Sequence, residues 1–267
     1  MSDPSRITSR QNAQVKEVVR LRNARDRGRA GKFIIDGARE ISRAVEAGIS
    51  LVQAFVCAEL ARSAEARAAI GQVTATTAEI LHVSPEVADK LAFGDRNDGV
   101  IVVAATPQRS LNDLHLSDKP IIAVLEGIEK PGNVGAILRS ADATGIDALI
   151  IADGRTDLFN PNTIRASLGT VFRPNVCEAT TAASIAWLRD KKLPILAARP
   201  DASKLYTEID LRRGVAIVLG SEATGLSDAW RAIDITPMKL PMHGIADSLN
   251  VSTTAAVLFY EALRQRT

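Results

Sequence analysis

Polar side chains suited to chemistry gather in three loops of this 267-residue chain, all in its C-terminal half. The most crowded loop, LPMHGIADSLN (residues 240–250), leads into apolar residues at helical spacing. We expect a helix from about Leu249, capped by the hydroxyl of Ser248. One cap satisfies a helix start, so the pattern is either a polar end on a packing helix or part of a site. Only the second interpretation explains the loop and the other polar residues around it, which are Asp247, Asn250, Ser252, Thr253 and Thr254.

A second loop, EGIEKPGNVGAILR, covers residues 126–139. Asn133 is a natural N-cap for the helix that follows. On this helix Arg139 lies off the apolar stripe beside small residues, which would leave an open groove around its guanidinium group. The alternative is an ion pair of Arg139 with Asp142, worth about 0.2–0.5 kcal/mol. The spacing leaves both interpretations open. The segment GNVG lacks the spacing of a dinucleotide-binding loop.

The third loop, GSEATGLS, covers residues 220–227 and follows the apolar run VAIVL. Gly220 permits a close backbone approach, and Glu222 places an acid at the mouth of a site. An ordinary turn from strand to helix, capped by Ser227, is the alternative. Each of the three loops follows a predicted buried strand. In an open parallel sheet the carboxyl ends of strands form the ligand-binding edge, so the joint occurrence of the loops favours a site there.

The elements that must position these loops form an α/β pattern. Apolar runs without alternation, separated by helices, indicate a parallel sheet covered on both faces. We predict strands at 120–125, 148–152, 174–177, 194–198, 215–219 and 234–239, with helices at 133–144, 162–168 and 182–191.

The N-terminal part alternates strand and helix in the same way and predicts a smaller α/β unit. We predict strands at 32–36, 51–57 and 99–104, and helices at 11–27, 38–47, 58–70 and 84–92. The polar segment 106–119 has no strong period and contains a proline, which is typical of a linker. The predicted domains are therefore 1–105 and 120–267, joined by 106–119.

Composition narrows the class of protein. Hydrophobic residues make up 46% of the chain and aromatics 4%, which predicts a globular core of Ala, Val, Ile and Leu. No apolar run reaches the length of a membrane span, and residues 1–9 do not resemble a signal peptide. We therefore expect a cytoplasmic protein that does not bind a membrane. The two cysteines and three histidines are dispersed, which predicts reduced thiols and no metal site.

Charge is uneven although the whole chain carries only +2. Residues 1–32 hold nine basic and three acidic side chains, a net +6 that leaves about −4 for the rest. A basic arm on a near-neutral body is typical of a polyanion partner, and we expect RNA contacts from Arg20, Arg22, Arg25 and Arg27. For a charge run alone, a solvated helix face is the more common explanation.

Together the three loops resemble a known family. The segments NVGAILR (133–139), LGSEATGLS (219–227) and LPMHGIADSLNVS (240–252) are similar to the three ordered motifs of the SpoU/TrmH family of RNA ribose 2′-O-methyltransferases, in the SPOUT superfamily. The resemblance covers about 120–266. Residues 9–104 are more loosely similar to the small substrate-binding domain of many members, with Asp36 where many relatives have glutamate.

The resemblance implies a C-terminal parallel-sheet domain with a deep trefoil knot, a rare exception to unknotted chains. It implies S-adenosylmethionine as cofactor and a homodimer whose active sites are completed across the interface. The backbone near Ala198, Gly220, Leu240 and Leu249 would bind the cofactor. The catalytic set would be Asn133, Arg139, Glu222, Ser248 and Asn250. Because arginine stays protonated, our hypothesis is that Arg139 grips a substrate phosphate, which helps to take the proton.

The RNA target is less defined by the sequence. The added N-terminal domain favours 23S ribosomal RNA, with transfer RNA as the alternative. A non-catalytic RNA-binding protein on the same fold is a second alternative, against which the five retained polar residues argue. A nucleotide-dependent α/β enzyme is a third, against which the basic arm and the missing glycine-rich fingerprint argue.

Overall fold

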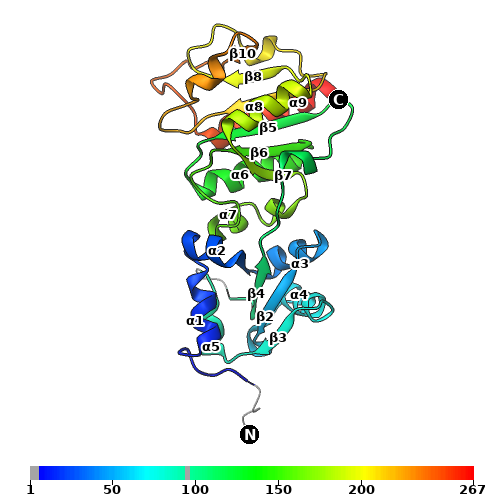
Figure 1. Ribbon diagram of the computed structural model, residues 1–267, viewed down its shortest axis with the longest axis vertical. Coiled ribbons are helices and arrows are strands. Elements are labelled where there is room, and N and C mark those ends of the chain that lie inside the picture. Colours follow the sequence, from blue (N-terminus) through cyan, green and yellow to red (C-terminus); the bar gives the residue numbers. More distant parts are fainter. Residues whose placement is uncertain (1–5, 94–96) are drawn as a thin grey trace. The chain divides into compact units, whose positions relative to one another are not determined.

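The computed structural model describes residues 6–93 and 97–267, and the chain divides into two compact units (Figure 1). Unit 1 comprises Met1–Gln108 and Phe159–Phe172; unit 2 comprises Arg109–Leu158 and Arg173–Thr267. Residues 159–172 thus group with unit 1, although they lie inside the range predicted for the second domain.

A six-stranded sheet forms the centre of unit 2, in the order β10-β8-β9-β5-β6-β7, and every neighbouring pair is parallel. All residues of β5, β6 and β9 are buried, as expected of apolar runs covered on both faces. The predicted parallel α/β sheet is confirmed. The strands are β5 (Ile121–Glu126), β6 (Ala148–Ala152), β7 (Val176–Ala179), β8 (Ile195–Ala198), β9 (Val215–Leu219) and β10 (Ile235–Met238).

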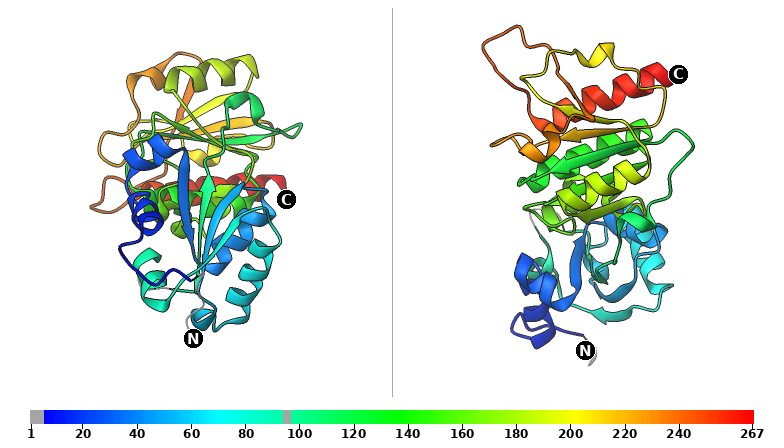
Figure 2. Two further views of the ribbon diagram at one scale, coloured as in Figure 1. Left: turned by 60° about the horizontal axis from the view of Figure 1, so that its bottom comes forward. Right: turned by 45° about the horizontal axis from the view of Figure 1, so that its top comes forward.

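Helices cover this sheet. Ile185 and Leu188 of α8 (Thr181–Asp190), with Trp230 of the short helix η5 (Asp228–Arg231), pack on one set of alternating strand residues. Helices α6 (Pro131–Thr144) and α9 (Val251–Arg266) pack against each other through their apolar stripes (Figure 2). Two further single-turn helices in this unit are η2 (Leu111–Asp113) and η4 (Tyr206–Glu208).

Two predicted helix caps in unit 2 are wrong. Helix α6 begins at Pro131, whose fixed φ suits the first helical position, so Asn133 lies inside the helix. Helix α9 begins at Val251, and its cap is Asn250, whose Oδ1 accepts from the backbone N–H of Ser252 at 2.8 Å. Ser248 lies two residues outside that cap. An asparagine carbonyl reaches the first turn as well as a serine hydroxyl does, so composition alone did not select the position.

Unit 1 contains a four-stranded mixed sheet in the order β1-β4-β2-β3. Strand β4 (Val100–Ala105) is antiparallel to β1 (Lys32–Asp36) and β2 (Leu51–Val56), while β2 and β3 (Glu79–His82) are parallel. The edge strand β3 was missed because it is short and only partly buried. Helices α3 (Ala38–Glu46), α4 (Ala64–Thr74) and α5 (Pro85–Leu91) complete the α/β pattern.

Two long helices predicted in unit 1 are each interrupted. The first divides into α1 (Ala13–Arg20) and α2 (Ala24–Ala30), because Asn23 caps α2 through the N–H of Arg25. The second divides into the short helix η1 (Ala58–Leu60) and α4, which Ser63 caps through the N–H of Ala66. In both cases a capping side chain inside the apolar period restarts the helix.

The segment 159–172 completes the core of unit 1. It contains α7 (Pro161–Ala166) and the short helix η3 (Thr170–Phe172). Phe33 stacks on Phe159 and Phe172, with ring centroids 4.5 and 6.0 Å apart. Arg165 forms an ion pair with Asp36 at 3.0 Å. Burial raises the pKa of the Asp36 carboxyl, while the N–H of Phe93 and Arg165 act in the opposite direction.

Candidate functional site

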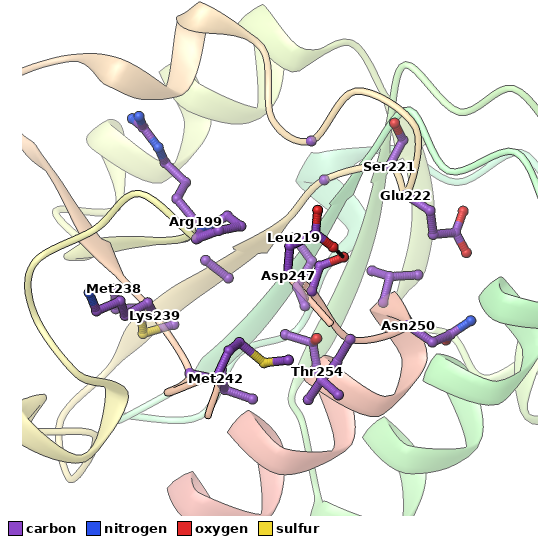
Figure 3. A pocket seen from close by; sticks show the side chains of 18 of the residues that line it. Arg199, Leu219, Ser221, Glu222, Met238, Lys239, Met242, Asp247, Asn250 and Thr254 are labelled. Atoms are coloured by element: carbon purple, nitrogen blue, oxygen red, sulfur yellow. Dashed lines mark hydrogen bonds between the residues drawn. The ribbon is translucent and has the colours of Figure 1, made fainter. Parts of the chain in front are cut away.

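A cavity of about 860 Å³ opens at the carboxyl ends of β8, β9 and β10 (Figure 3). We name it the main cavity. Its walls come from residues after β8, from residues 220–227 after β9 (the Gly220 loop), and from residues 240–250 between β10 and α9 (the Leu240 loop). The volume suits a small-molecule site, and the position is the edge predicted from the sequence.

The four residues predicted to bind the cofactor, Ala198, Gly220, Leu240 and Leu249, all line the main cavity. For Gly220, however, the close approach is internal to the protein. A Cβ atom there would lie 2.3 Å from the carbonyl carbon of Gly225 and 2.5 Å from the N of Leu226. Gly220 is therefore required by the turn of its own loop, and its backbone also lines the main cavity.

Three of the five predicted catalytic residues meet at one rim of the main cavity. The Nδ2 amide of Asn133, on α6, donates to Oε1 of Glu222 in the Gly220 loop. The Nδ2 amide of Asn250 donates to Oδ1 of Asn133 at 3.4 Å. Figure 3 shows Glu222 and Asn250 on the same side of the cavity. Asn250 thus has two roles, because its Oδ1 caps α9 while its Nδ2 joins the polar cluster.

The other two predicted catalytic residues lie apart from this cluster. Ser248 lines the main cavity, and its hydroxyl donates to Oδ1 of Asp247 at 3.4 Å. Arg139 is exposed, does not line the cavity, and has no hydrogen bond or ion pair among the described residues. Asp142 instead accepts from Arg173 at 2.6 Å, so the alternative of an Arg139–Asp142 pair is wrong. Six residues along α6, Arg139 is about 9 Å from Asn133 along the axis.

Several residues of the main cavity escaped the sequence analysis. Lys130 and Arg199 add charge, and Met238 and Met242 add apolar surface. Arg199 is held by Asp201, to which it donates through Nε at 3.0 Å and Nη2 at 2.5 Å, and these hydrogen bonds lower the pKa of Asp201. Arg199 directly follows the predicted strand 194–198, and Met238 lies near the end of the predicted strand 234–239. That place was a usable signal, but their residue types alone indicated nothing.

The main cavity fits a nucleoside with a charged amino-acid chain. Leu219, Leu240 and Val251 supply apolar surface for a base, and Lys130 and Asp247 can face a carboxylate and a cation. Residues 240–249 make no backbone hydrogen bond to any other described residue, so their N–H and C=O groups are open to a ligand. Free backbone N–H and C=O groups can form hydrogen bonds with the edge of a base, and this needs no charged side chain of the protein.

The arginines predicted to contact RNA divide into two pairs. Arg20 and Arg25 are exposed on α1 and α2. Arg22 donates through Nη2 to the carbonyls of Lys90, Leu91 and Ala92 at the end of α5. Arg27 is only 4% exposed and donates to the carbonyls of Leu21 and Arg22. Burial excludes Arg27 from an RNA surface, which corrects the prediction for that residue.

Within 6–93 and 97–267, no group of three or more histidine, cysteine, aspartate or glutamate side chains could hold a metal ion. In the same ranges no helix has both the length and the apolar character needed to cross a membrane.

Both halves of the chain match known protein families. Residues 120–260 match the SpoU rRNA Methylase family, and residues 12–102 match the MRM3-like substrate binding domain. A 23S rRNA (uridine(2479)-2′-O)-methyltransferase of Streptomyces viridochromogenes is 31% identical over 98% of this chain and 92% of its own length. The 23S rRNA (guanosine-2′-O-)-methyltransferase RlmB of Xylella fastidiosa (strain 9a5c) is 34% identical over 71% and 79%.

Solved structures are similar over nearly the whole chain. The crystal structure of an RNA 2′-O ribose methyltransferase has a TM-score of 0.83 and 44% identity, covering 98% of this chain and 99% of its own. The SpoU methyltransferase AviRb from Streptomyces viridochromogenes, in complex with the cofactor AdoMet, has a TM-score of 0.88 and 26% identity, covering 96% and 98%.

The chain belongs to the SpoU family of RNA ribose 2′-O-methyltransferases. It is an RNA methyltransferase that uses S-adenosylmethionine, as the motif resemblance implied.

Proposed function

We propose that this protein transfers a methyl group from S-adenosylmethionine to a ribose 2′-hydroxyl of 23S ribosomal RNA in the cytoplasm. The observation that carries the proposal is the polar cluster of Asn133, Glu222 and Asn250 at the rim of the main cavity. The names of the bacterial relatives support the ribosomal target.

The residues of the main cavity fit S-adenosylmethionine, which when bound would supply an electrophilic methyl group. We assign donor binding to the backbone near Ala198, Gly220, Leu240 and Leu249. A ribose hydroxyl is a poor nucleophile, so the protein must align it and help its proton to leave. Glu222, oriented by Asn133, and the hydroxyl of Ser248 are two of the polar groups at the cavity, and we assign them to holding the sugar.

Arg139 would serve the site of a partner subunit. It is exposed, has no ion pair among the described residues, and lies about two turns of α6 from Asn133. A guanidinium group there can grip an RNA phosphate with two parallel hydrogen bonds. We therefore propose a homodimer in which α6 and α9 form part of the interface. Tyr260 of α9 is 54% exposed and supplies apolar surface for that contact.

We also propose that unit 2 contains the trefoil knot of the family. Helix α9 returns from the outermost strand, β10, to pack against α6, which follows the central strand β5. A knot requires in addition that this segment thread through a loop, and the Leu240 loop lines the main cavity together with residues that follow β8 and β9. Residues 1–105 would bind RNA, with Arg20 and Arg25 as exposed phosphate contacts.

Mapping of 2′-O-methyl positions in RNA from cells with and without the gene tests the proposed target. One missing methyl group in 23S ribosomal RNA is the expected result. A missing methyl group in transfer RNA would establish the alternative substrate. If the purified protein binds RNA but not S-adenosylmethionine by calorimetry, it is a non-catalytic RNA-binding protein.

A further inference from the structure

Glu126 is a buried carboxylate next to the site, and it has no role in the methyl transfer proposed above. It is the last residue of β5, and only 7% of it is exposed. Its Oε1 accepts from the hydroxyls of Ser227 at 2.7 Å and Thr181 at 2.9 Å. Its Oε2 accepts from the backbone N–H of Ser227 at 2.7 Å. One side chain therefore joins the central strand, the start of α8 and the end of the Gly220 loop.

The Gly220 loop is packed only in part. Leu226 packs against the core of the sheet, whereas Ser221 and Gly225 line the main cavity on one side and a second cavity of about 600 Å³ on the other. Where a cavity lies on each side, close packing contributes less and hydrogen bonds contribute more to holding the loop. Inside the loop the N–H of Gly225 donates to the carbonyl of Ser221 at 3.0 Å, and the hydroxyls of Ser221 and Thr224 lie 2.9 Å apart.

These internal bonds give the loop its shape but do not attach it to the sheet. At its entry the loop continues directly from β9. At its exit the hydroxyl of Ser227, which would ordinarily cap η5, makes no capping bond and points to Glu126 instead. The alternative of a turn capped by the Ser227 side chain is therefore wrong. The exit is attached by the carboxylate of Glu126, beside the apolar packing of Leu226.

We propose that Glu126 is a positioning residue for methyl transfer, which attaches the exit of the Gly220 loop and so holds Glu222 against Asn133. The proposal rests on the methyltransferase function above. Misplacement of a reacting group by about 1 Å can cost roughly a hundredfold in rate, so a small movement of this loop is sufficient.

The test compares Glu126→Ala, Glu126→Gln and the control Thr181→Val in single-turnover methylation of ribosomal RNA. Glu126→Ala should slow methyl transfer by about 100-fold. Glu126→Gln should stay within about threefold of the wild type, because its carbonyl can accept from the Ser227 N–H while its amide donates to both hydroxyls. Thr181→Val removes the hydroxyl's bond to Glu126 and its interaction with Asp153 but leaves both bonds to Ser227, so it should retain the wild-type rate.

The same change in a Glu222→Ala background separates positioning from general weakening. If Glu126 acts through Glu222, Glu126→Ala should slow the Glu222→Ala enzyme by less than about threefold. Its effect on the melting temperature should be equal in both backgrounds. An equal loss of rate in both backgrounds, a wild-type rate for Glu126→Ala, or a glutamine variant as slow as the alanine variant would each overturn the proposal.

Ser227→Ala replaces Glu126→Ala in the test if Glu126→Ala fails to fold, because it removes the hydrogen bond from the Ser227 hydroxyl to the same carboxylate. It should slow transfer by about fivefold in the wild type and not at all in Glu222→Ala. Hydrogen exchange of the amides at 221–227 distinguishes failure of the anchoring by Glu126 from failure of the proposed function. If the wild type does not methylate RNA, the proposed function fails. If those amides exchange equally fast with and without Glu126, the anchoring fails by itself.

Discussion

The two loops that face each other across the main cavity are built in opposite ways. The Gly220 loop is bonded internally, turns at Gly225 with a φ of 67°, and is attached by Glu126. The Leu240 loop makes no backbone hydrogen bond to described residues from 240 to 249, and most of its side chains are exposed. One wall is therefore pre-formed, while the other can gain its hydrogen bonds from the ligand.

Gly220→Ala should have the largest effect on donor binding. Its Cβ would meet the backbone of Gly225 at 2.3 Å, which no flexible side chain can relieve. Overpacking of this kind costs about 1–3 kcal/mol of stability, and we expect the affinity for S-adenosylmethionine to fall by about 100-fold or more. Calorimetry and a denaturant melt measure the two effects.

Gly244→Ala is the matched control from the opposite wall. A Cβ at Gly244 would meet nothing within 4 Å. Its affinity and stability should therefore stay near the wild-type values. Equal losses in the two variants would show that the loops do not differ as described.

Arg139 lies outside both walls of the main cavity, so Arg139→Ala should affect catalysis alone. Methyl transfer should fall by about 100-fold, while stability changes by about 0.5 kcal/mol or less and donor affinity is retained. Arg139→Lys should restore little, because a point charge lacks the planar two-pronged grip on phosphate. Single-turnover methylation beside a thermal melt is the measurement. An early melt with normal transfer per folded molecule would make Arg139 a structural residue.

Hydrogen exchange should show the contrast between the loops directly. On addition of S-adenosylmethionine, amides at 240–249 should slow by about tenfold or more, because the ligand supplies partners that the protein does not. Amides at 221–227 should change much less, since their bonds exist already. Equal protection of both loops would contradict a pre-formed Gly220 wall.

The smallest effects are expected from single arginines of unit 1. Arg20→Ala and Arg25→Ala should each reduce the slope of log affinity for RNA against log salt by about 1. Arg22→Ala should instead lower stability, because its guanidinium group binds three carbonyls at the end of α5. A change in slope for Arg22→Ala with an unchanged melt would reverse this assignment.

The sequence predicted the parallel sheet of unit 2 because its strands are continuous apolar runs, and burial on both faces leaves little freedom. It also placed the three loops at one edge, where Asn133, Glu222 and Asn250 meet. It could not predict that Gly220 packs tightly against the backbone of Gly225, because this contact depends on where the loop returns in space. The hydrogen bonds of Glu126 likewise join residues 101 positions apart, a distance at which no local pattern operates.

The segment 159–172 has a consequence for attempts to dissect the protein. The chain leaves unit 1 after Gln108, returns at Phe159 and leaves again after Phe172. A fragment that ends in the segment 106–119 would lack Phe159 and Phe172, the partners of the Phe33 ring, and the Arg165 that pairs with Asp36. Such a fragment should aggregate or unfold, whereas a version with residues 159–172 supplied as a separate peptide should recover its fold. The N-terminal unit is thus not a detachable module, and exchange between relatives has to move both pieces together.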